Sequence, residues 1–385
     1  MFKPPFCPHR DCSQHLEPAP RFYHRHGTYH PKCRPRPVPR FFCKACRRTF
    51  SRQTFRMDYR DHRPDLNARF FECVTMGVGI RMSARRLGLS LRCAELKLRK
   101  IARHLRQLNL NLRRPLEGHV SFQFDEVETF EANRSLRPLS VPVLLEKETR
   151  YLVWAEAATI RPKGKMTPAR LQKLRMEHEK RGYRKDRSRR ACRRTLARGR
   201  ELVDEDTRIT LFSDEKSSYP GLARAAFGVR RLCHLTTNSK LARTTWNPLF
   251  PVNHEDARMR DMMGRLRRQS WLVSQRRRYL DLALQVQMAY RNLVRPRFNY
   301  DDRSPAEMLG FVSRRLTKEE ALGWSQRWGK RSLHPLSPRG RSVAEMEAAR
   351  RVAALVWRSA AASLPTRNPG SLLREPRWPG RRWWC

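Results

Sequence analysis

Three acidic residues lie where predicted strands and a helix begin or end. Residues 120–127 alternate apolar and polar side chains, as a half-buried strand does, and Asp125 ends that strand on its polar face. Residues 209–214 form another short strand that ends in Asp214, and Glu255 begins a helical stretch. Carboxylates at such positions can converge at one edge of a sheet. Together they can hold the two divalent ions that metal-dependent phosphodiester cleavage requires.

The expected ion at these acids is Mg²⁺ or Mn²⁺. Hard divalent cations prefer anionic oxygen ligands, whereas zinc prefers nitrogen and sulfur donors. Taken alone, each acid is more often a turn former or an ion-pair partner. Their order along a strongly cationic chain favours a shared site.

Cysteine pairs near the start of the chain have the spacing of a zinc ribbon. The first pair is separated by four residues and the second by two, and each pair can supply two thiolates from one tight turn. A segment this polar has little else to fold around, although cysteines without metal remain an alternative. His9 or Cys33 could replace Cys12 in the site. The expected ligands are Cys7, Cys12, Cys43 and Cys46.

Residues 66–105 have a helical pattern with a short break, which predicts a helix-turn-helix. Ser83 is expected to cap the shorter helix, Gly88 to adopt the left-handed conformation after it, and Ser90 to cap the next helix. That next helix has an apolar stripe and a basic face, as a recognition helix in the major groove requires, or as a solvated basic helix would show. The stripe is Leu91, Ala94, Leu98, Ile101 and Leu105, and the basic face carries Arg92, Arg99, Lys100 and Arg103.

Strands and helices alternate through the middle of the chain, which is typical of an α/β domain. Further strands are expected at 139–145, 151–158 and 231–236, the first two continuing from 120–127 as an antiparallel meander. The basic segment 161–206 is expected to be a helical insert. Its arginine-dense run at 187–200 fits a solvated charge run as well as a DNA contact.

Helical patterns dominate the rest of the chain. A capping box, Ser304 to Glu307 with proline at the first helical position, predicts a short helix closed by Gly310. The last sixty residues are expected to be weakly ordered. The helices are predicted at 255–268, 275–294 and, within that tail, 342–358.

The composition of the chain indicates what kind of partner it binds and where in the cell it acts. The 385 residues include 83 Lys and Arg against 36 Asp and Glu, a formal net charge of +47, so a polyanion is the expected partner. The length suits two or three domains, and 39% apolar residues can build a core, which excludes a wholly disordered basic protein. Neither a signal peptide nor an apolar run long enough to span a membrane is evident, so we expect a soluble intracellular protein.

Several motifs together resemble prokaryotic insertion-sequence transposases of the DDE type, over residues 7–311. They are the zinc ribbon, the helix-turn-helix, Gln-Phe-Asp-Glu at 123–126, Phe-Ser-Asp-Glu-Lys-Ser-Ser-Tyr at 212–219, and the segments 253–274 and 298–310. The resemblance implies a multidomain chain in which these N-terminal modules precede an α/β ribonuclease H-like catalytic domain. It also implies that the first Asp lies on the first strand, the second on the fourth, and the Glu on a following helix.

By this resemblance the catalytic residues are Asp125, Asp214 and Glu255. One alignment places Asn253 at the third position, where a neutral oxygen would bind metal less tightly. The implied domains are a zinc ribbon (1–55), a helix-turn-helix domain (62–110), a catalytic domain (117–295) with the insert 161–206, a helical extension (296–325) and a basic tail (326–385).

The expected function is a DNA transposase that binds inverted-repeat ends, cleaves a strand and transfers the freed 3′-hydroxyl to target DNA. Its cofactors would be catalytic Mg²⁺ or Mn²⁺ and structural Zn²⁺. Its partner would be double-stranded DNA, and no membrane is expected to be involved. The protein would be cytoplasmic, associated with the nucleoid, and would form a homo-oligomer in the DNA complex. Arg265 and Arg268 are expected to add DNA contacts. The alternatives are a catalytically inactive DNA-binding protein, such as a decayed transposase or a zinc-ribbon regulator, and a basic RNA-associated structural protein.

Overall fold

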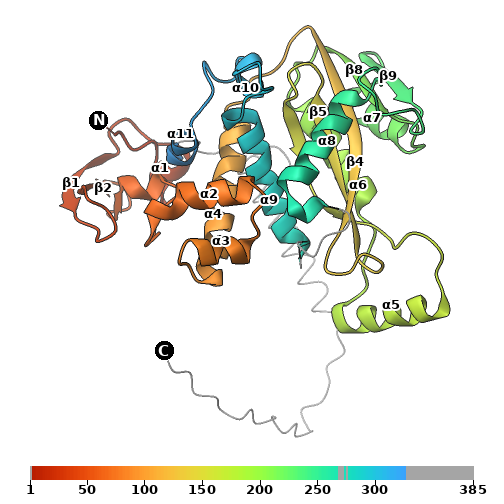
Figure 1. Cartoon of the computed structure of the whole chain (residues 1–385). Coiled ribbons are helices and arrows are strands. Elements are labelled where there is room, and N and C mark those ends of the chain that lie inside the picture. Colours follow the sequence, from red (N-terminus) through yellow and green to blue (C-terminus); the bar gives the residue numbers. More distant parts are fainter. Residues whose placement is uncertain (1, 268–272, 275, 327–385) are drawn as a thin grey trace, which may run out of the picture. The chain divides into compact units, whose positions relative to one another are not determined.

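The structure is a computed structural model that describes residues 2–267, 273–274 and 276–326 (Figure 1). Apart from Gln326, the tail predicted for 326–385 and its helix at 342–358 lie outside these residues. Within the described residues no helix is long and apolar enough to cross a membrane.

The N-terminal part is a small antiparallel sheet with an aromatic core. Its strands are β1 (Tyr23–Tyr29), β2 (Val38–Cys43) and β3 (Thr49–Ser51), in that spatial order, and a short helix α1 (Ser13–Leu16) precedes them. Phenylalanine rings and the cysteines fill the space beneath this sheet. The buried rings belong to Phe6, Phe22, Phe41, Phe50 and Phe55.

Three helices follow, α2 (Asn67–Thr75), α3 (Ile80–Arg86) and α4 (Leu91–Asn111). The break between α3 and α4 has the predicted chemistry. Gly88 has a φ of +61°, and the Ser90 hydroxyl accepts a hydrogen bond of 3.2 Å from the Cys93 amide. The predicted caps on either side of the turn are therefore confirmed.

The prediction that Ser83 caps the shorter helix is wrong. The cap of that helix, α3, lies four residues earlier, at Gly79 in an extended conformation. Ser83 is buried inside the helix, and its hydroxyl donates to the Gly79 carbonyl at 3.1 Å. A serine inside a helix often bonds back in this way, so it gives a cap-like signal without being a cap.

The apolar stripe of α4 is buried as predicted except at its first residue. Ala94, Leu98, Ile101 and Leu105 are buried, whereas Leu91 is exposed. The stripe shares one hydrophobic core with the central sheet, and α4 packs against helix α9 (Arg277–Ala289). Helix α4 is thus a core helix along most of its length.

A mixed central sheet is the framework of the molecule. Its strand order is β6-β5-β4-β8-β9, with the two-residue strand β7 paired to β5. β4, β5 and β6 are antiparallel neighbours, which confirms the predicted meander, while β8 and β9 run parallel to β4. The strands are β4 (His119–Phe130), β5 (Pro138–Glu146), β6 (Leu152–Ala155), β7 (Ala158–Thr159), β8 (Arg208–Asp214) and β9 (Leu232–Thr237).

Helices cover both faces of this sheet. One face packs against α6 (Ser188–Arg200) and α7 (Tyr219–Phe227), and the other against α8 (Phe250–Met262) and α9. α8 begins earlier than the predicted residue 255, because proline in its first turn already starts the helix.

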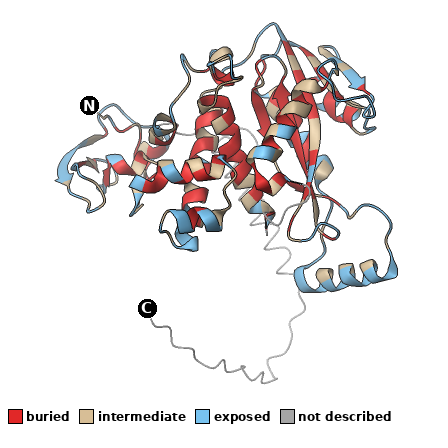
Figure 2. Cartoon of the chain, viewed as in Figure 1, coloured by how far each residue is buried: buried red, intermediate tan, exposed pale blue. Residues whose placement is uncertain are grey.

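The predicted basic insert 161–206 divides into two unlike helices (Figure 2). α5 (Pro168–Arg181) has no buried residue, whereas α6 buries one side against β5 and α7. At Gly199 a Cβ would lie 2.6 Å from a Leu144 methyl carbon, so this helix needs glycine to approach the strand. The arginine-dense run of α6 is therefore the outer side of a core helix.

The described chain ends in short helical segments. A π-helical turn (Tyr290–Val294) follows α9, and α10 (Pro305–Met308) and α11 (Lys318–Gly323) come next. The predicted capping box of Ser304 and Glu307 is present, and Gly310 has a φ of +68°. Short 3-10 turns lie at Arg52–Phe55, Pro64–Leu66 and Gly264–Leu266.

Candidate functional site

Asp125 and Asp214 lie on neighbouring parallel strands and face the same side of the sheet. The parallel pairing of β4 with β8 ends at Phe124 and Ser213, immediately before the two aspartates. Asp125 is in the middle of β4, not at its end as expected, because β4 continues to pair with β5 up to Phe130. Asp125 therefore marks the point where the pairing of β4 with β8 ends, and not the end of β4 itself.

The start of α8 shows which side of the sheet this is. The Gln123 side chain donates to the Pro248 carbonyl at 2.6 Å and accepts from the Val252 amide at 2.7 Å. Side chains two apart on a strand share a face, so Asp125 faces α8 as Gln123 does. Asp214 faces the same way, since it follows Phe212, which packs in the core on that side.

The electrostatics of Asp125 are dominated by burial, with the like charge of Asp214 and the opposite charge of Arg243 as further influences. Burial, and then the charge of Asp214, raises the pKa of Asp125 to about 6, although its Oδ1 accepts from the Glu126 amide at 2.7 Å. Like charges this close resist ionisation. A cation between the two carboxylates would remove that resistance.

A third carboxylate, Asp256, comes from α8. It is 5% exposed, and its Oδ1 atom has no hydrogen-bond partner among the described residues. Burial, followed by the charge of Asp125, raises the pKa of Asp256 well above its ordinary value. An unpartnered buried carboxylate oxygen is costly unless it binds a metal or a proton. Carboxylate oxygens are the ligand type that a hard divalent cation prefers. Among the described residues, however, only the four N-terminal cysteines lie close enough together to form a metal-binding group in this structure.

Glu255, the expected third acid, has a different neighbour. Successive helix residues project about 100° apart, and Glu255 points toward the π-helical turn after α9, where its two oxygens accept from the Arg291 Nε at 3.0 and 3.1 Å. Arg258 lies 3.7 Å from the same carboxylate. Asn253, the alternative ligand, is three residues before Asp256 and on the same side of the helix. The assignment of Glu255 or Asn253 to the metal stays a prediction.

Sequence reasoning missed Asp256 for an identifiable reason. Val252 and Met259 are the buried apolar residues of α8, and both Glu255 and Asp256 lie at helical spacing from them. Periodicity therefore puts both acids on the inward side. Only the position of Arg291, a residue far along the chain, separates their roles.

Behind the aspartates, on the other face of the sheet, Glu126 ties the two strands together. Its carboxylate accepts hydrogen bonds from the Tyr219 hydroxyl at 2.8 Å, from Lys216 and from Ser140. Lys216 and Tyr219 belong to the segment that follows Asp214. The network thus holds the end of β8 against the middle of β4.

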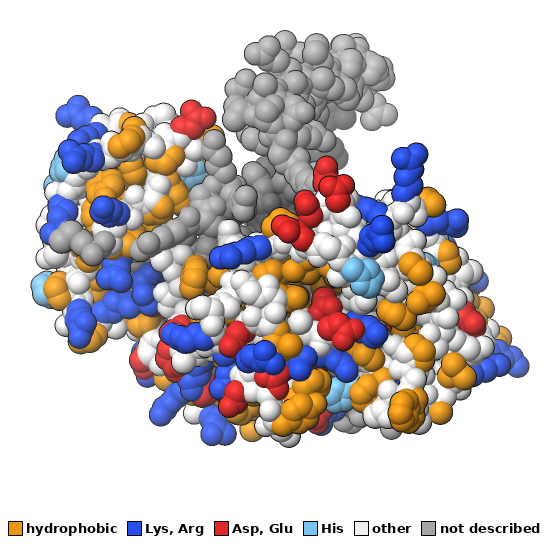
Figure 3. All heavy atoms as spheres, turned by 90° about the horizontal axis from the view of Figure 1, so that it is seen from above, with side chains coloured by type: hydrophobic (Ala, Val, Ile, Leu, Met, Phe, Trp, Pro, Cys, Tyr) orange, Lys and Arg blue, Asp and Glu red, His pale blue; other side chains and the backbone are white. Residues whose placement is uncertain are grey.

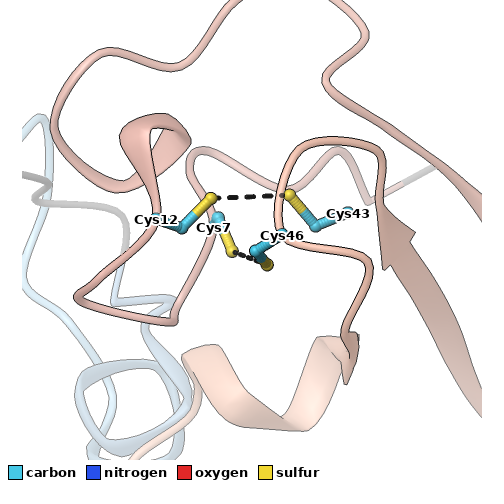
Figure 4. A group of neighbouring side chains, drawn as sticks. All are labelled: Cys7, Cys12, Cys43 and Cys46. Carbon is cyan, nitrogen blue, oxygen red and sulfur yellow. Dashed lines mark hydrogen bonds between the residues drawn. The ribbon is translucent and has the colours of Figure 1, made fainter.

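The four predicted zinc ligands form a cluster in the N-terminal part (Figure 4). Their sulfur atoms all lie within 4.8 Å of one another, and the Cys7–Cys46 and Cys12–Cys43 pairs are each 3.7 Å apart. A tetrahedron with Zn–S bonds of about 2.3 Å has S···S edges of roughly 3.8 Å, so the cluster has the size of a zinc site. Cys33 and His9 lie outside this group.

The thiols also have the electrostatics of a site built for a cation. Burial raises the pKa of Cys7 and of Cys12. Cys46 is the exception, because hydrogen bonds from Arg48 outweigh burial and lower its pKa to about 7. Four thiolates in one buried group need a cation, and the cluster could hold structural zinc.

Comparisons with known proteins give a likeness among solved structures. No family model matches the chain, and no curated protein matches it. Among solved structures, the chain is similar to the crystal structure of the catalytic domain of Mos1 mariner transposase, at 13% identity and a TM-score of 0.23. The likeness covers 58% of this chain and 91% of that one. A TM-score this low says nothing about the site.

The basic residues of α4 differ in how they are held. Arg92 and Arg103 are exposed. Arg99 donates to the Tyr279 hydroxyl at 2.9 Å, and Lys100 donates to a backbone carbonyl at 2.7 Å. Arg92 and Arg103 are thus the members of the predicted set with exposed side chains.

Arg265 and Arg268, the two further predicted DNA contacts, differ from the exposed arginines of α4. Arg265 is half-buried, donates to the Ser274 hydroxyl at 2.6 Å, and has its pKa lowered by burial. Arg268 lies outside the described residues. On the face drawn in Figure 3, Lys and Arg side chains lie in several separate places, and over the larger, lower part acidic side chains lie among them.

Proposed function

We propose that this protein is a DNA transposase of the DDE type, which cleaves DNA strands and joins them to target DNA with a divalent metal. The observation that supports the proposal is the placement of Asp125 and Asp214 on adjacent parallel strands, facing α8, the helix that carries the buried Asp256 with its unbonded Oδ1 atom. We assign Asp256 as the third ligand in place of Glu255.

The metal would be Mg²⁺ or Mn²⁺, held by these carboxylates. Such an ion supplies activation of the attacking oxygen and stabilisation of the leaving oxygen. The chain's own contribution is to fix the ligands. α8 presents Asp256 from above the sheet, and the Glu126 network holds the two aspartates in register from below. The Glu255–Arg291 pair joins α8 to the π-helical turn that follows α9.

The remaining parts fit a protein that holds DNA while it acts. The cysteine cluster would bind one structural zinc, and α3 and α4 form the helix-turn-helix, with Arg92 and Arg103 on the DNA side. The partners would be inverted-repeat ends and target duplex in the nucleoid, bound by a homo-oligomer. These assignments rest on the charge of the chain and on the exposure of these side chains.

A plasmid nicking assay tests the function. Purified full-length protein is incubated with supercoiled plasmid carrying the element's ends, with Mg²⁺ or Mn²⁺, and nicked products are scored on a gel. We expect Asp125→Asn, Asp214→Asn and Asp256→Asn each to abolish nicking while end binding persists. Tight end binding without nicking by the unaltered protein would instead favour a DNA-binding protein without catalysis.

A further inference from the structure

Residues 161–186 leave the central sheet and return to it at one point, and we name them the excursion. The Thr159 hydroxyl donates to the Lys185 carbonyl at 2.6 Å, and the Arg187 amide donates to the Thr159 carbonyl at 2.8 Å. The sheet before the excursion and α6 after it are complete without it. The excursion is therefore an addition to the core fold.

Its helix, α5, is specified by its ends and not by packing. The Thr167 hydroxyl accepts from the Arg170 amide at 3.3 Å, Pro168 occupies the first turn, and Gly182 follows the helix with a φ of +81°. None of its residues is buried (Figure 2). Isolated helices of this length are marginal in water, so a helix with no buried face gains stability when it binds a partner.

One side of α5 rests on the turn between β4 and β5. Glu177 accepts from Arg137 at 2.6 Å, and Arg170 donates to the Ser135 carbonyl at 2.7 Å. Just beyond the helix, Arg184 pairs with Glu131 at 3.3 Å. These contacts fix the base of the excursion and neutralise the charges on its inner side.

Other exposed charges of the excursion are left unneutralised. The excursion contains ten Lys and Arg and three Asp and Glu. On α5, Lys173, Arg175 and Lys180 are exposed and make no ion pair within the described part of the chain. Exposed cations in this number complement a polyanion.

The excursion leaves the sheet near the C-terminal end of β4, the end toward which β4 continues after Asp125. Thr159 pairs with Leu139, which pairs with Thr129, four residues beyond Asp125. Four strand residues span about 13 Å along β4, and the two steps from β4 through β5 to β7 add about 10 Å across the sheet. Because a duplex carries a phosphate charge about every 1.7 Å of its axis, DNA bound at the acids would present phosphates to the excursion as well.

We propose that α5 is a DNA-backbone clamp, in which Lys173, Arg175 and Lys180 bind phosphates of the duplex that lies in the acidic site. This inference rests on the proposed function and deepens it. Exposed apolar residues on the excursion, Leu171, Met176 and Tyr183, would suit a protein partner such as a second copy, but the excess of cations favours DNA.

The test measures the salt dependence of duplex binding by the full chain. Fluorescence anisotropy with a labelled duplex gives the affinity at several salt concentrations, for the unaltered protein and for Lys173→Gln/Arg175→Gln/Lys180→Gln. We expect the slope of log affinity against log salt to become shallower by about 2.7, since each lost phosphate contact removes about 0.9. A second variant, with 163–184 replaced by a short Gly-Ser linker across the paired ends, should lose at least as much.

The matched control removes three exposed arginines near the starts of β4, β8 and β9, at the opposite end of the sheet: Arg114, Arg208 and Arg230, each changed to Gln. Its slope should stay near that of the unaltered protein. An unchanged slope in the α5 variant, or an equal change in the control, would overturn the clamp while leaving the transposase proposal intact. A change of oligomeric state with an unchanged slope would assign α5 to a second copy. Failure of the unaltered protein to bind duplex would overturn the proposed function as well.

Discussion

Glu255 and Asp256 are neighbours in sequence and opposites in their electrostatics. Glu255 is buried with a bound guanidinium, that of Arg291, whereas Asp256 is buried beside another carboxylate and has an oxygen without a partner. The charge of Asp125 disfavours ionisation of Asp256, while the charges of Arg260 and Arg243 oppose this effect. A buried acid whose pKa is raised beside another acid is typical of functional sites.

This contrast predicts opposite effects on folding. Glu255→Gln leaves the Arg291 guanidinium buried without a counter-charge, and breaking a buried pair in this way costs about 3 kcal/mol or more. Asp256→Asn removes a charge that folding disfavours, so in buffer without divalent metal it should leave the melting temperature unchanged or raise it. Thermal unfolding of the two variants beside the unaltered protein measures both effects. Equal destabilisation by both would mean that Asp256 has a structural partner.

At the scale of elements, His104 joins α4 to the C-terminal helices. Its Nε2 donates to the Ala321 carbonyl at 2.8 Å, and its Nδ1 accepts from the Gln326 side chain at 3.3 Å, an arrangement that needs the neutral ring. Burial lowers the pKa of His104 to about 4. The folded protein therefore resists protonation of this ring.

The consequence is a stability that falls with acid. Because the folded pKa of His104 lies below the unfolded value, the unfolded chain takes up the proton first, and stability declines as the pH falls from about 6.5 to 4, by up to about 3 kcal/mol. His104→Gln removes this contribution. Urea unfolding of both proteins across that range gives the difference, in which shared carboxylate effects cancel. Parallel pH profiles would show that His104 is not protonated on unfolding.

Zinc binding by the four-cysteine cluster can also be tested directly. Loss of one thiolate leaves three ligands for zinc and exposes a position to water, as in open rather than structural sites. We expect one zinc per unaltered chain, and Cys43→Ser to retain much less, measured by metal analysis of the full-length protein. Cys33→Ser is the matched control and should keep its zinc. Stoichiometric zinc in Cys43→Ser would exclude this ligand set.

At the scale of the whole molecule, local patterns predicted most elements, and long-range contacts decided the rest. The strands, the Ser90 cap and the capping box at Ser304 follow from alternation and short spacings. The role of α6 did not follow from a local pattern. Its many arginines leave only a narrow apolar stripe, which ends at Gly199 and packs on β5, so the sequence looks like a charged run. The choice between Glu255 and Asp256 depends on Arg291, 36 residues later, which no local pattern contains.

Direct metal binding tests the central claim, that Asp125, Asp214 and Asp256 form one divalent-metal site. Zinc-loaded full-length protein is titrated with Mn²⁺ by isothermal calorimetry or electron paramagnetic resonance, beside Asp256→Asn and Glu255→Gln. Loss of an outer partner of a metal ligand already costs about 10- to 100-fold in affinity, so loss of the ligand itself in Asp256→Asn should raise the Kd by at least that factor. Glu255→Gln, if folded, should bind Mn²⁺ nearly as the unaltered protein does. Unchanged Mn²⁺ binding by Asp256→Asn would contradict the account.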